Sequence, residues 1–188
     1  MSRPAFHRIV VLVAPLAVAT ALHAQAPASA APDLSDPEVA HVAVTANSID
    51  IDLAKFAQTR SRNAAVRQFA ATMITDHSAV NAQAAALATK LGVTPADNAV
   101  SQSLQRGAKQ ARVSLESLRG AAFDRAYMDR EIAYHQAVLD AIDKVLVPTT
   151  ENVELKQLLV DVRPAIATHL AHAKEVRGRL GDTPRSSK

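Results

Sequence analysis

Three histidines occupy positions of the sequence where a helix would bury its side chains. His77, His135 and His169 lie in segments whose apolar residues recur every three or four positions, and each histidine stands where the next apolar residue is due. Imidazole nitrogens are good ligands for zinc, copper and iron. Histidines in this setting predict either a metal site or a network of buried hydrogen bonds.

Carboxylates accompany these histidines at helical spacing. Glu131 precedes His135 by four residues and shares its face, and His172 can share a face with His169 in the same way. Asp50 lies near the middle of the first long amphipathic segment. Carboxylate ligands shift the metal preference of a site toward iron or manganese. The first interpretation is therefore a single bound metal ion, with iron, zinc and copper as the candidates. Its expected ligands are His77, His135, His169, Glu131 and Asp50.

The second interpretation is that each histidine is a core residue whose ring is satisfied by a neighbouring polar group. Tyr127, Tyr134 and Asp76 are available as partners, and a partnered histidine can fix the register between helices. The protein would then be a non-catalytic structural, stress-related or interaction protein. In an acid-sensing form of this interpretation, protonation of the buried histidines weakens the fold. The sequence leaves both interpretations open.

The ligand pattern of di-iron proteins is absent. Those proteins take a Glu from each of two helices and a Glu-x-x-His pair from each of the other two. Here Glu131 is four residues from His135, and adjacent residues such as Asp76 and His77 point about 100° apart on a helix. We therefore expect neither ferroxidase nor oxygenase activity, and we assign no catalytic residue.

A charged stretch, "FDRAYMDRE" at residues 123–131, precedes His135. Opposite charges at helical spacing are typical of a solvated face. We therefore expect a solvated face rather than a recognition patch, with Asp124 as an alternative helix cap. The residues of this face are Asp124, Arg125, Asp129, Arg130 and Glu131.

Five helical segments must position these residues. Apolar periodicity predicts helices over about 37–60, 63–91, 99–118, 120–148 and 151–180. Ser61 or Asn63 can cap the second of them. Pro164 lies inside the last segment, where it predicts a kink or a fresh start with Asp161 as the cap. Because no segment alternates with period two, we expect no strands.

Two long helices, a long connection with an extra helix, and two more long helices are the wiring of an all-α, ferritin-like four-helix bundle with one crossover. In an antiparallel bundle the helix midpoints share a layer. His77, His135, His169 and Asp50 lie close to the midpoints of four different segments, so we expect them to meet inside the bundle.

Three blocks of sequence carry a resemblance to a known family. "DHSAVNA" (76–82), "GAAFDRAYMDREIAYH" (120–135) and "RPAIATHLAHAKE" (163–175) resemble the signature blocks of the bacterial exported family called domain of unknown function 4142, over about residues 36–180. The resemblance implies a ferritin-like helical fold and an exported location, and it leaves the activity unassigned. It also implies a Glu in the first helix where this chain has Asp50, within "SIDIDLAKFA".

The first 26 residues have the pattern of a secretory signal peptide. Arg3 and Arg8 precede an apolar run over residues 9–22, and Ala24-Gln25-Ala26 is a small-x-small cleavage site. Cleavage there removes 2 of the 21 basic residues, which leaves 19 against 18 acidic ones. We expect a periplasmic or secreted protein with a flexible leader over 27–37, the bundle over 38–180 and a disordered tail over 181–188.

Composition excludes several classes of partner. Only 3% of the residues are aromatic, which gives little surface for stacking on single-stranded nucleic acid, and the near-neutral mature chain offers no basic stretch for nucleic acid. Without cysteine the chain is neither a lipoprotein nor a disulfide scaffold. Its Ala, Val and Leu content predicts a narrow core of closely approaching helices. We expect no transmembrane anchor after cleavage, name no protein partner, and leave a homo-oligomer open.

Overall fold

A computed structural model describes residues 32–181, which form long helices joined by short loops. The predicted signal peptide and residues 182–188 of the predicted tail lie outside the described residues. Within them no strand occurs, so the all-α prediction is confirmed. The elements are α1 (Asp36–Arg60), α2 (Ala64–Leu91), α3 (Ala99–Glu116), α4 (Gly120–Ala141), the π-helical η1 (Ile142–Leu146), α5 (Val147–Thr149) and α6 (Val153–Arg179).

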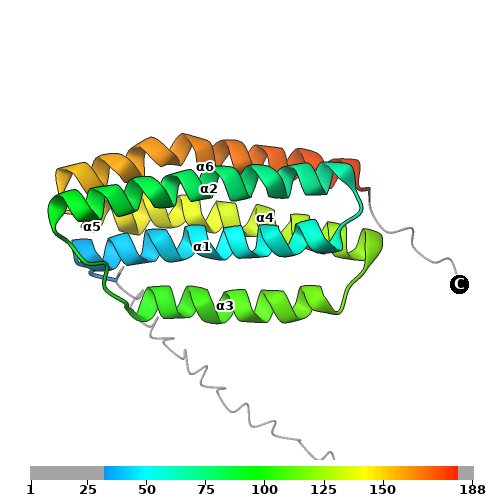
Figure 1. Cartoon of the computed structure of the whole chain (residues 1–188), viewed down its shortest axis with the longest axis horizontal. Coiled ribbons are helices and arrows are strands. Elements are labelled where there is room, and N and C mark those ends of the chain that lie inside the picture. Colours follow the sequence, from blue (N-terminus) through cyan, green and yellow to red (C-terminus); the bar gives the residue numbers. More distant parts are fainter. Residues whose placement is uncertain (1–31, 182–188) are drawn as a thin grey trace, which may run out of the picture. The chain divides into compact units, whose positions relative to one another are not determined.

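Four long helices form the bundle, and the fifth, α3, belongs to the crossover between the two helical pairs (Figure 1). α1 packs against α2, α4 packs against α6, and α2 also contacts α6, whereas α3 lies outside the bundle against α1 and α4. This is the predicted four-helix arrangement with an extra helix in its long connection. It gives every bundle helix one face toward a common interior.

Local sequence sets the helix ends. Asn63 caps α2, because its side-chain oxygen accepts hydrogen bonds from the backbone N–H groups of Ala65 and Val66 at 2.9 and 3.3 Å. Ser35 and Glu38 form a capping box at the start of α1. α2 ends at Gly92, whose φ of 64° lies in the left-handed region that glycine adopts without strain.

One expected boundary is wrong. α6 runs unbroken through Pro164 from Val153 to Arg179, so Asp161 does not cap a new helix. Pro164 lies on the exposed face of α6, away from the tightly packed interior. Water can satisfy the carbonyl group that loses its hydrogen bond to a proline there.

The interior changes character along the bundle. Toward the end where α1 leads into α2, the core contains four aromatic residues and two methionines, all at most 8% exposed: Phe56, Phe69, Met73, Phe123, Tyr127 and Met128. Toward the other end it is aliphatic, with Val39, Val42, Leu139, Ile142, Leu155 and Leu159. The buried polar residues of α1, α2, α4 and α6 lie between these two regions.

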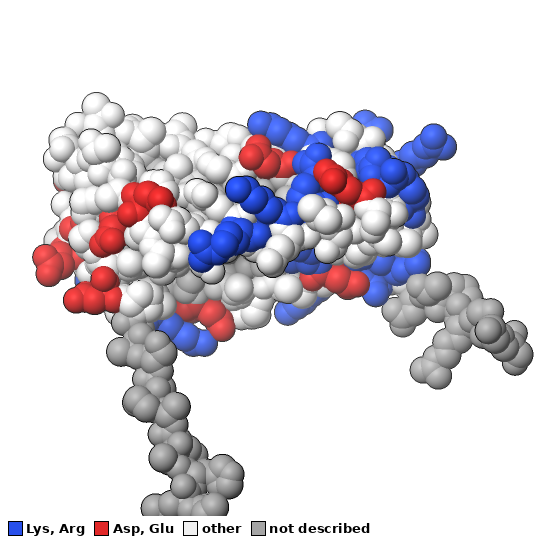
Figure 2. Space-filling view, turned by 90° about the horizontal axis from the view of Figure 1, so that it is seen from below, with Lys and Arg blue, Asp and Glu red and all other residues white. Residues whose placement is uncertain are grey.

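Charge is also unevenly distributed on the surface. In the view of Figure 2, Lys and Arg side chains gather toward one end of the bundle, while the other end carries mainly Asp and Glu. Within residues 32–181, no helix combines the length and apolar character needed to cross a membrane.

Candidate metal centre

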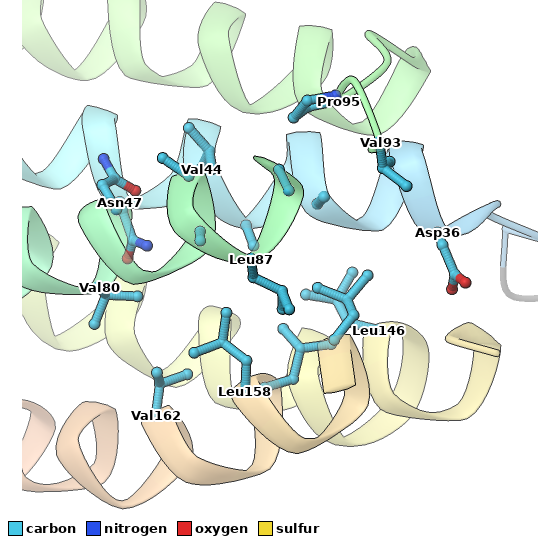
Figure 3. A pocket seen from close by; sticks show the side chains of 18 of the residues that line it. Asp36, Val44, Asn47, Val80, Leu87, Val93, Pro95, Leu146, Leu158 and Val162 are labelled. Atoms are coloured by element: carbon cyan, nitrogen blue, oxygen red, sulfur yellow. The ribbon is translucent and has the colours of Figure 1, made fainter. Parts of the chain in front are cut away.

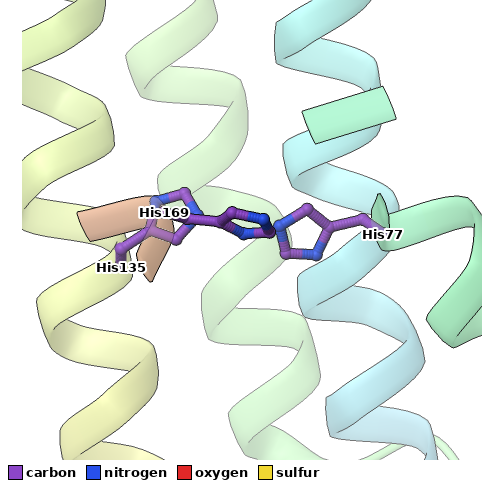
Figure 4. A group of neighbouring side chains, drawn as sticks. All are labelled: His77, His135 and His169. Atoms are coloured by element: carbon purple, nitrogen blue, oxygen red, sulfur yellow. The ribbon is translucent and has the colours of Figure 1, made fainter. Parts of the chain in front are cut away.

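Three imidazole rings meet in the middle of the bundle, as the sequence predicts. His77 comes from α2, His135 from α4 and His169 from α6, and their ring centroids lie 5.2 to 5.7 Å apart (Figure 4). All three residues are at most 5% exposed. One ring nitrogen of each lies within 4.8 Å of a ring nitrogen of the other two. The group could therefore hold a metal ion.

His135 and His169 each have one ring nitrogen committed to an acceptor. Nδ1 of His135 donates to the backbone carbonyl of Glu131 at 2.9 Å, and Nε2 of His169 donates to the Asp76 carboxylate at 2.9 Å. In a neutral imidazole the second nitrogen then carries a lone pair. Both of these second nitrogens are buried and have no hydrogen-bond partner among the described residues. Histidines that ligate metals are held in the same way, through the nitrogen that does not bind the ion.

His77 follows the same pattern. Its Nδ1 donates to the side-chain oxygen of Asn47 at 2.7 Å, which leaves the lone pair on Nε2. That nitrogen lies 3.0 Å from Oδ2 of Asp50, with which it forms an ion pair when the ring is protonated. When the ring is neutral, the two electron-rich atoms repel each other unless a cation lies between or beside them.

Asp50 supplies the carboxylate nearest to the rings, although its side chain is shorter than that of the Glu expected from the family resemblance. The residue is completely buried, and its Oδ2 lies 3.0 Å from Nε2 of His77 and 3.9 Å from Nε2 of His135. Donor atoms about 2.1 Å from a tetrahedral ion lie about 3.4 Å apart, so the measured separations fit a shared ion. Burial would raise the pKa of Asp50, but its interactions with His77 and His135 and a hydrogen bond from Glu131 lower it below its usual range.

Glu131 is completely buried beside this group and could join Asp50 and His135 in a second set of metal ligands. Burial and the charge of Asp50 raise the pKa of Glu131 well above its usual range, against the opposing effect of Arg130. A cation at the centre would favour the ionised carboxylate.

Arg130 neutralises the two carboxyl groups. Its Nη1 lies 2.7 Å from Glu131 and 3.3 Å from Asp50, and its guanidinium lies over the ring of Tyr134 at 3.9 Å. The side chain is only 14% exposed. Burial would lower the pKa of Arg130, but the charges of Glu131 and Asp50 raise it above its usual value. The expected solvated face is therefore wrong for Arg130, and also for Asp124 and Glu131, which are buried.

The five residues predicted as ligands share one more property. Each has a buried nitrogen or oxygen without a hydrogen-bond partner among the described residues, namely Oδ2 of Asp50, Nε2 of His77, Oε2 of Glu131, Nε2 of His135 and Nδ1 of His169. Buried polar atoms in proteins are almost always paired. Five such atoms lie in one layer of the bundle, where Oδ2 of Asp50 and Nε2 of His77 are 3.0 Å apart, and a cation at this place could be shared among them.

Other residues of the sequence prediction turn out differently. His172 does not join the cluster, because its ring packs edge-on against Phe69 at a centroid distance of 5.3 Å. Sequence reasoning missed Asn47 and Arg130. An asparagine three residues before Asp50 was a usable signal, because it shares that face of the helix and is a poor helix former. Arg130 gave no such signal, since its neighbours in sequence are charged on every side.

Two of the rings, those of His135 and His169, are favoured in the neutral form that can bind a metal ion. Burial lowers the pKa of His135 to about 4, which the charge of Asp50 only partly opposes. Burial also lowers the pKa of His169, against the opposing effect of its hydrogen bond to Asp76. A metal ion therefore has little competition from protons at neutral pH.

Comparison with known proteins gives a family and nothing more specific. The family described as "Domain of unknown function (DUF4142)" matches residues 20–176. No curated protein matches the chain, and no solved structure matches it. The matched span contains every residue of the candidate centre.

Proposed function

The chain belongs to the family described as Domain of unknown function (DUF4142), whose description names no activity, and from the geometry of its buried centre we propose that it binds one divalent first-row transition metal ion. His77, His135, His169 and Asp50 are the ligands, and Glu131 is a further ligand or a proton-releasing neighbour. The bundle is ferritin-like in this proposal, with the ion held at mid-height between four helices.

The observation that carries the proposal is the direction of the ring nitrogens. In each histidine one nitrogen donates to an acceptor, and the other is buried without a hydrogen-bond partner among the described residues; that of His77 faces the Asp50 carboxylate at 3.0 Å. A hydrogen-bond network that only stabilised the core would pair these nitrogens with one another or with donors. Lone pairs that converge repel one another unless a cation lies among them.

The donor set favours zinc, iron or copper. Imidazole suits all three ions, and the Asp50 and Glu131 carboxylates add weight to iron. Three histidines and one carboxylate are a suitable ligand set for a single metal ion. The absent Glu-x-x-His pairs argue against a di-iron centre, so binding, storage or sensing of one ion fits better than oxygen chemistry.

We place this function outside the cytoplasm, in the periplasm or beyond the cell. Support comes from the charged, apolar and small-residue pattern of residues 1–26. The chain has no cysteine, so oxidising conditions there would not alter the donor set.

Metal titration of matched histidine variants tests the proposal. We would strip the protein with a chelator and titrate zinc by calorimetry into the wild type, His135→Ala and His172→Ala. The wild type and His172→Ala should each bind one ion per chain, because His172 lies outside the cluster. The His135→Ala variant lacks a side chain that contacts the ion directly, so its binding should be weaker by about 100-fold or more.

Two controls make the result decisive. Circular dichroism must show that His135→Ala remains helical, and the titration is repeated with ferrous iron under anaerobic conditions. Equal binding by the wild type and His135→Ala, or none by the wild type with either ion, would refute the metal site. The second result would favour the structural alternative, in which the same residues form a polar network around Arg130.

A further inference from the structure

A large apolar cavity lies between the bundle helices on one side of the histidine layer. Its volume is about 670 Å³, and it is bounded by α1, α2, α4, η1 and α6. Figure 3 shows Val80, Leu87, Leu146, Leu158 and Val162 around this space, which lies between the second half of α2 and the first half of α6. Small-molecule sites commonly have about this volume and this apolar lining.

The inner end of the cavity adjoins the candidate metal centre. On each bundle helix the lining stops one helical turn short of a centre residue. The pairs of last lining residue and centre residue are Asn47 and Asp50, Val80 and His77, Val138 and His135, and Ile166 and His169.

The opposite side of the histidine layer is closed. There the interior is filled by Phe69, Met73, Phe123, Tyr127 and Met128, and each of these side chains is fully buried. A molecule that approaches the centre along the bundle interior must therefore come through the cavity.

Two asparagines of the lining, Asn47 and Asn81, lie at its inner end, while its other polar residues line the outer part. The Asn81 side-chain nitrogen donates to Oγ of Ser48 at 3.3 Å, whereas the Asn81 side-chain oxygen is buried without a hydrogen-bond partner among the described residues. Asn47 lines the same region and holds His77 through its own side-chain oxygen. Both asparagines stand at the end that adjoins the histidine layer. This end can accept a hydrogen bond from an entering molecule.

The rest of the lining favours a ligand whose main part is an alkyl chain. It contains no aromatic, Lys or Arg side chain, and both carboxylate oxygens of Asp36, its one charged residue, already accept backbone N–H groups of Glu151 and Asn152 at 2.9 Å. Along α1 the lining extends from Asp36 to Asn47, which is about 16 Å at 1.5 Å per residue. That length suits an extended alkyl chain.

We propose that this cavity binds one aliphatic chain molecule whose small, neutral, hydroxyl-bearing end lies at Asn47 and Asn81 beside the metal centre. The proposal deepens the proposed metal function, because it names the class of molecule that reaches the ion, and it rests on that function only for what the polar end meets beyond the asparagines. The alkyl body fills the space toward Leu87, Leu146 and Leu158.

Binding of 1-decanol to matched variants tests the proposal. Ala84 lines the cavity, whereas Ala86 is exposed on the outer face of the same helix, so Ala84→Phe fills the space and Ala86→Phe is its control. We would titrate 1-decanol into metal-free and zinc-treated protein and follow methyl signals by NMR. The wild type and Ala86→Phe should bind one molecule in both forms, and Ala84→Phe should bind at least ten-fold more weakly while its circular dichroism is unchanged.

The orientation is measured in the same samples. Intermolecular NOEs should connect the CH₂OH protons of decanol with Val80 and Ile166, and its terminal methyl with Leu87 and Leu146. No uptake by the wild type, equal uptake by the two Phe variants, a reversed orientation, or dimerisation that closes the cavity would each overturn the proposal. The metal-free samples test decanol binding independently of the metal. Decanol uptake without zinc binding would reject the metal function and keep this inference. Zinc binding without decanol uptake would reject this inference and keep the metal function.

Discussion

His135 shows at the scale of one residue how the fold prepares a ligand. The backbone carbonyl of Glu131 holds its Nδ1, so the ring is oriented by the helix that carries it, and the free Nε2 turns toward Asp50. Burial makes protonation of this ring unfavourable. The cost of that arrangement is a fold that weakens in acid.

In the metal-free protein, the contribution of His135 to stability should fall as the pH drops from 6.5 toward 4. Burial lowers the folded-state pKa of His135 to about 4 from an ordinary value of 6.5, so in this interval the unfolded chain binds a proton that the folded chain does not. This contribution is a loss of about 1.4 kcal/mol per pH unit, and Glu131, whose pKa is raised, contributes in the opposite direction. Urea unfolding in chelator at several pH values measures it. His135→Gln should show a smaller slope, and an equal slope would contradict the account.

Arg130 is the counterion of two buried carboxyl groups, so its removal should be costly. Arg130→Met leaves the Asp50 charge buried without its partner and should lower the free energy of unfolding by about 3 kcal/mol. Adding Glu131→Gln should restore part of the loss, because a neutral amide needs no counterion. Urea unfolding of both variants in chelator measures the difference. A loss below about 1 kcal/mol, the range of exposed ion pairs, would mean that Arg130 is solvated.

At the scale of helices, the sequence predicts the elements well because their signals are local. Apolar periodicity and the cap at Asn63 placed α1, α2 and α6 within a few residues of their bounds. Of the two outcomes expected at Pro164, the fresh start at Asp161 is wrong, because one missing hydrogen bond on an exposed face does not end a helix that packs along its whole length.

Contacts between helices could not be read from the sequence. Helix midpoints brought His77, His135 and His169 into one layer, but the pairing of Asn47 with His77 depends on the rotation of two helices about their axes. The Ala, Val and Leu content of the chain predicted a narrow core of closely approaching helices, and the second half of α2 is rich in alanine. There the small side chains of Ala84, Ala85 and Ala88 instead line the cavity between α2 and α6. Small residues permit close packing without enforcing it.

Two glycines should respond in opposite ways to substitution by alanine. Gly92 ends α2 with a φ of 64°, where a side chain is strained, so Gly92→Ala should lower the free energy of unfolding by about 1 kcal/mol. Gly107 lies inside α3 with open space around its Cα, so Gly107→Ala should raise it by about 0.5 to 1 kcal/mol. Thermal unfolding monitored by circular dichroism compares the two. Changes of the same sign would contradict the helix assignments.

At the scale of the bundle interior, the candidate centre separates two unlike regions. Phe69 and Tyr127 belong to the packed aromatic side, and Leu87 and Leu158 belong to the side with the cavity. This division would give an ion at the candidate centre a packed wall on one side and an approach on the other. A bundle that needed only a stable core would be packed on both sides.

The protein isolated from the periplasm should lack its first 26 residues. The small-x-small pattern of Ala24, Gln25 and Ala26 predicts cleavage after Ala26, so the intact mass should correspond to residues 27–188. Mass spectrometry of the periplasmic fraction measures it. An uncleaved chain confined to the cytoplasm would contradict the exported location.

The most direct test of the metal centre is elemental analysis of the native protein. The mature chain would be isolated from the periplasm without chelators or a His tag, beside a His77→Ala, His135→Ala double variant, and analysed by mass spectrometry for iron, zinc and copper. The buried, converging nitrogens predict close to one ion per chain in the wild type and none in the variant. A metal-free wild type whose unfolding midpoint is unchanged by added iron, zinc or copper would contradict the account.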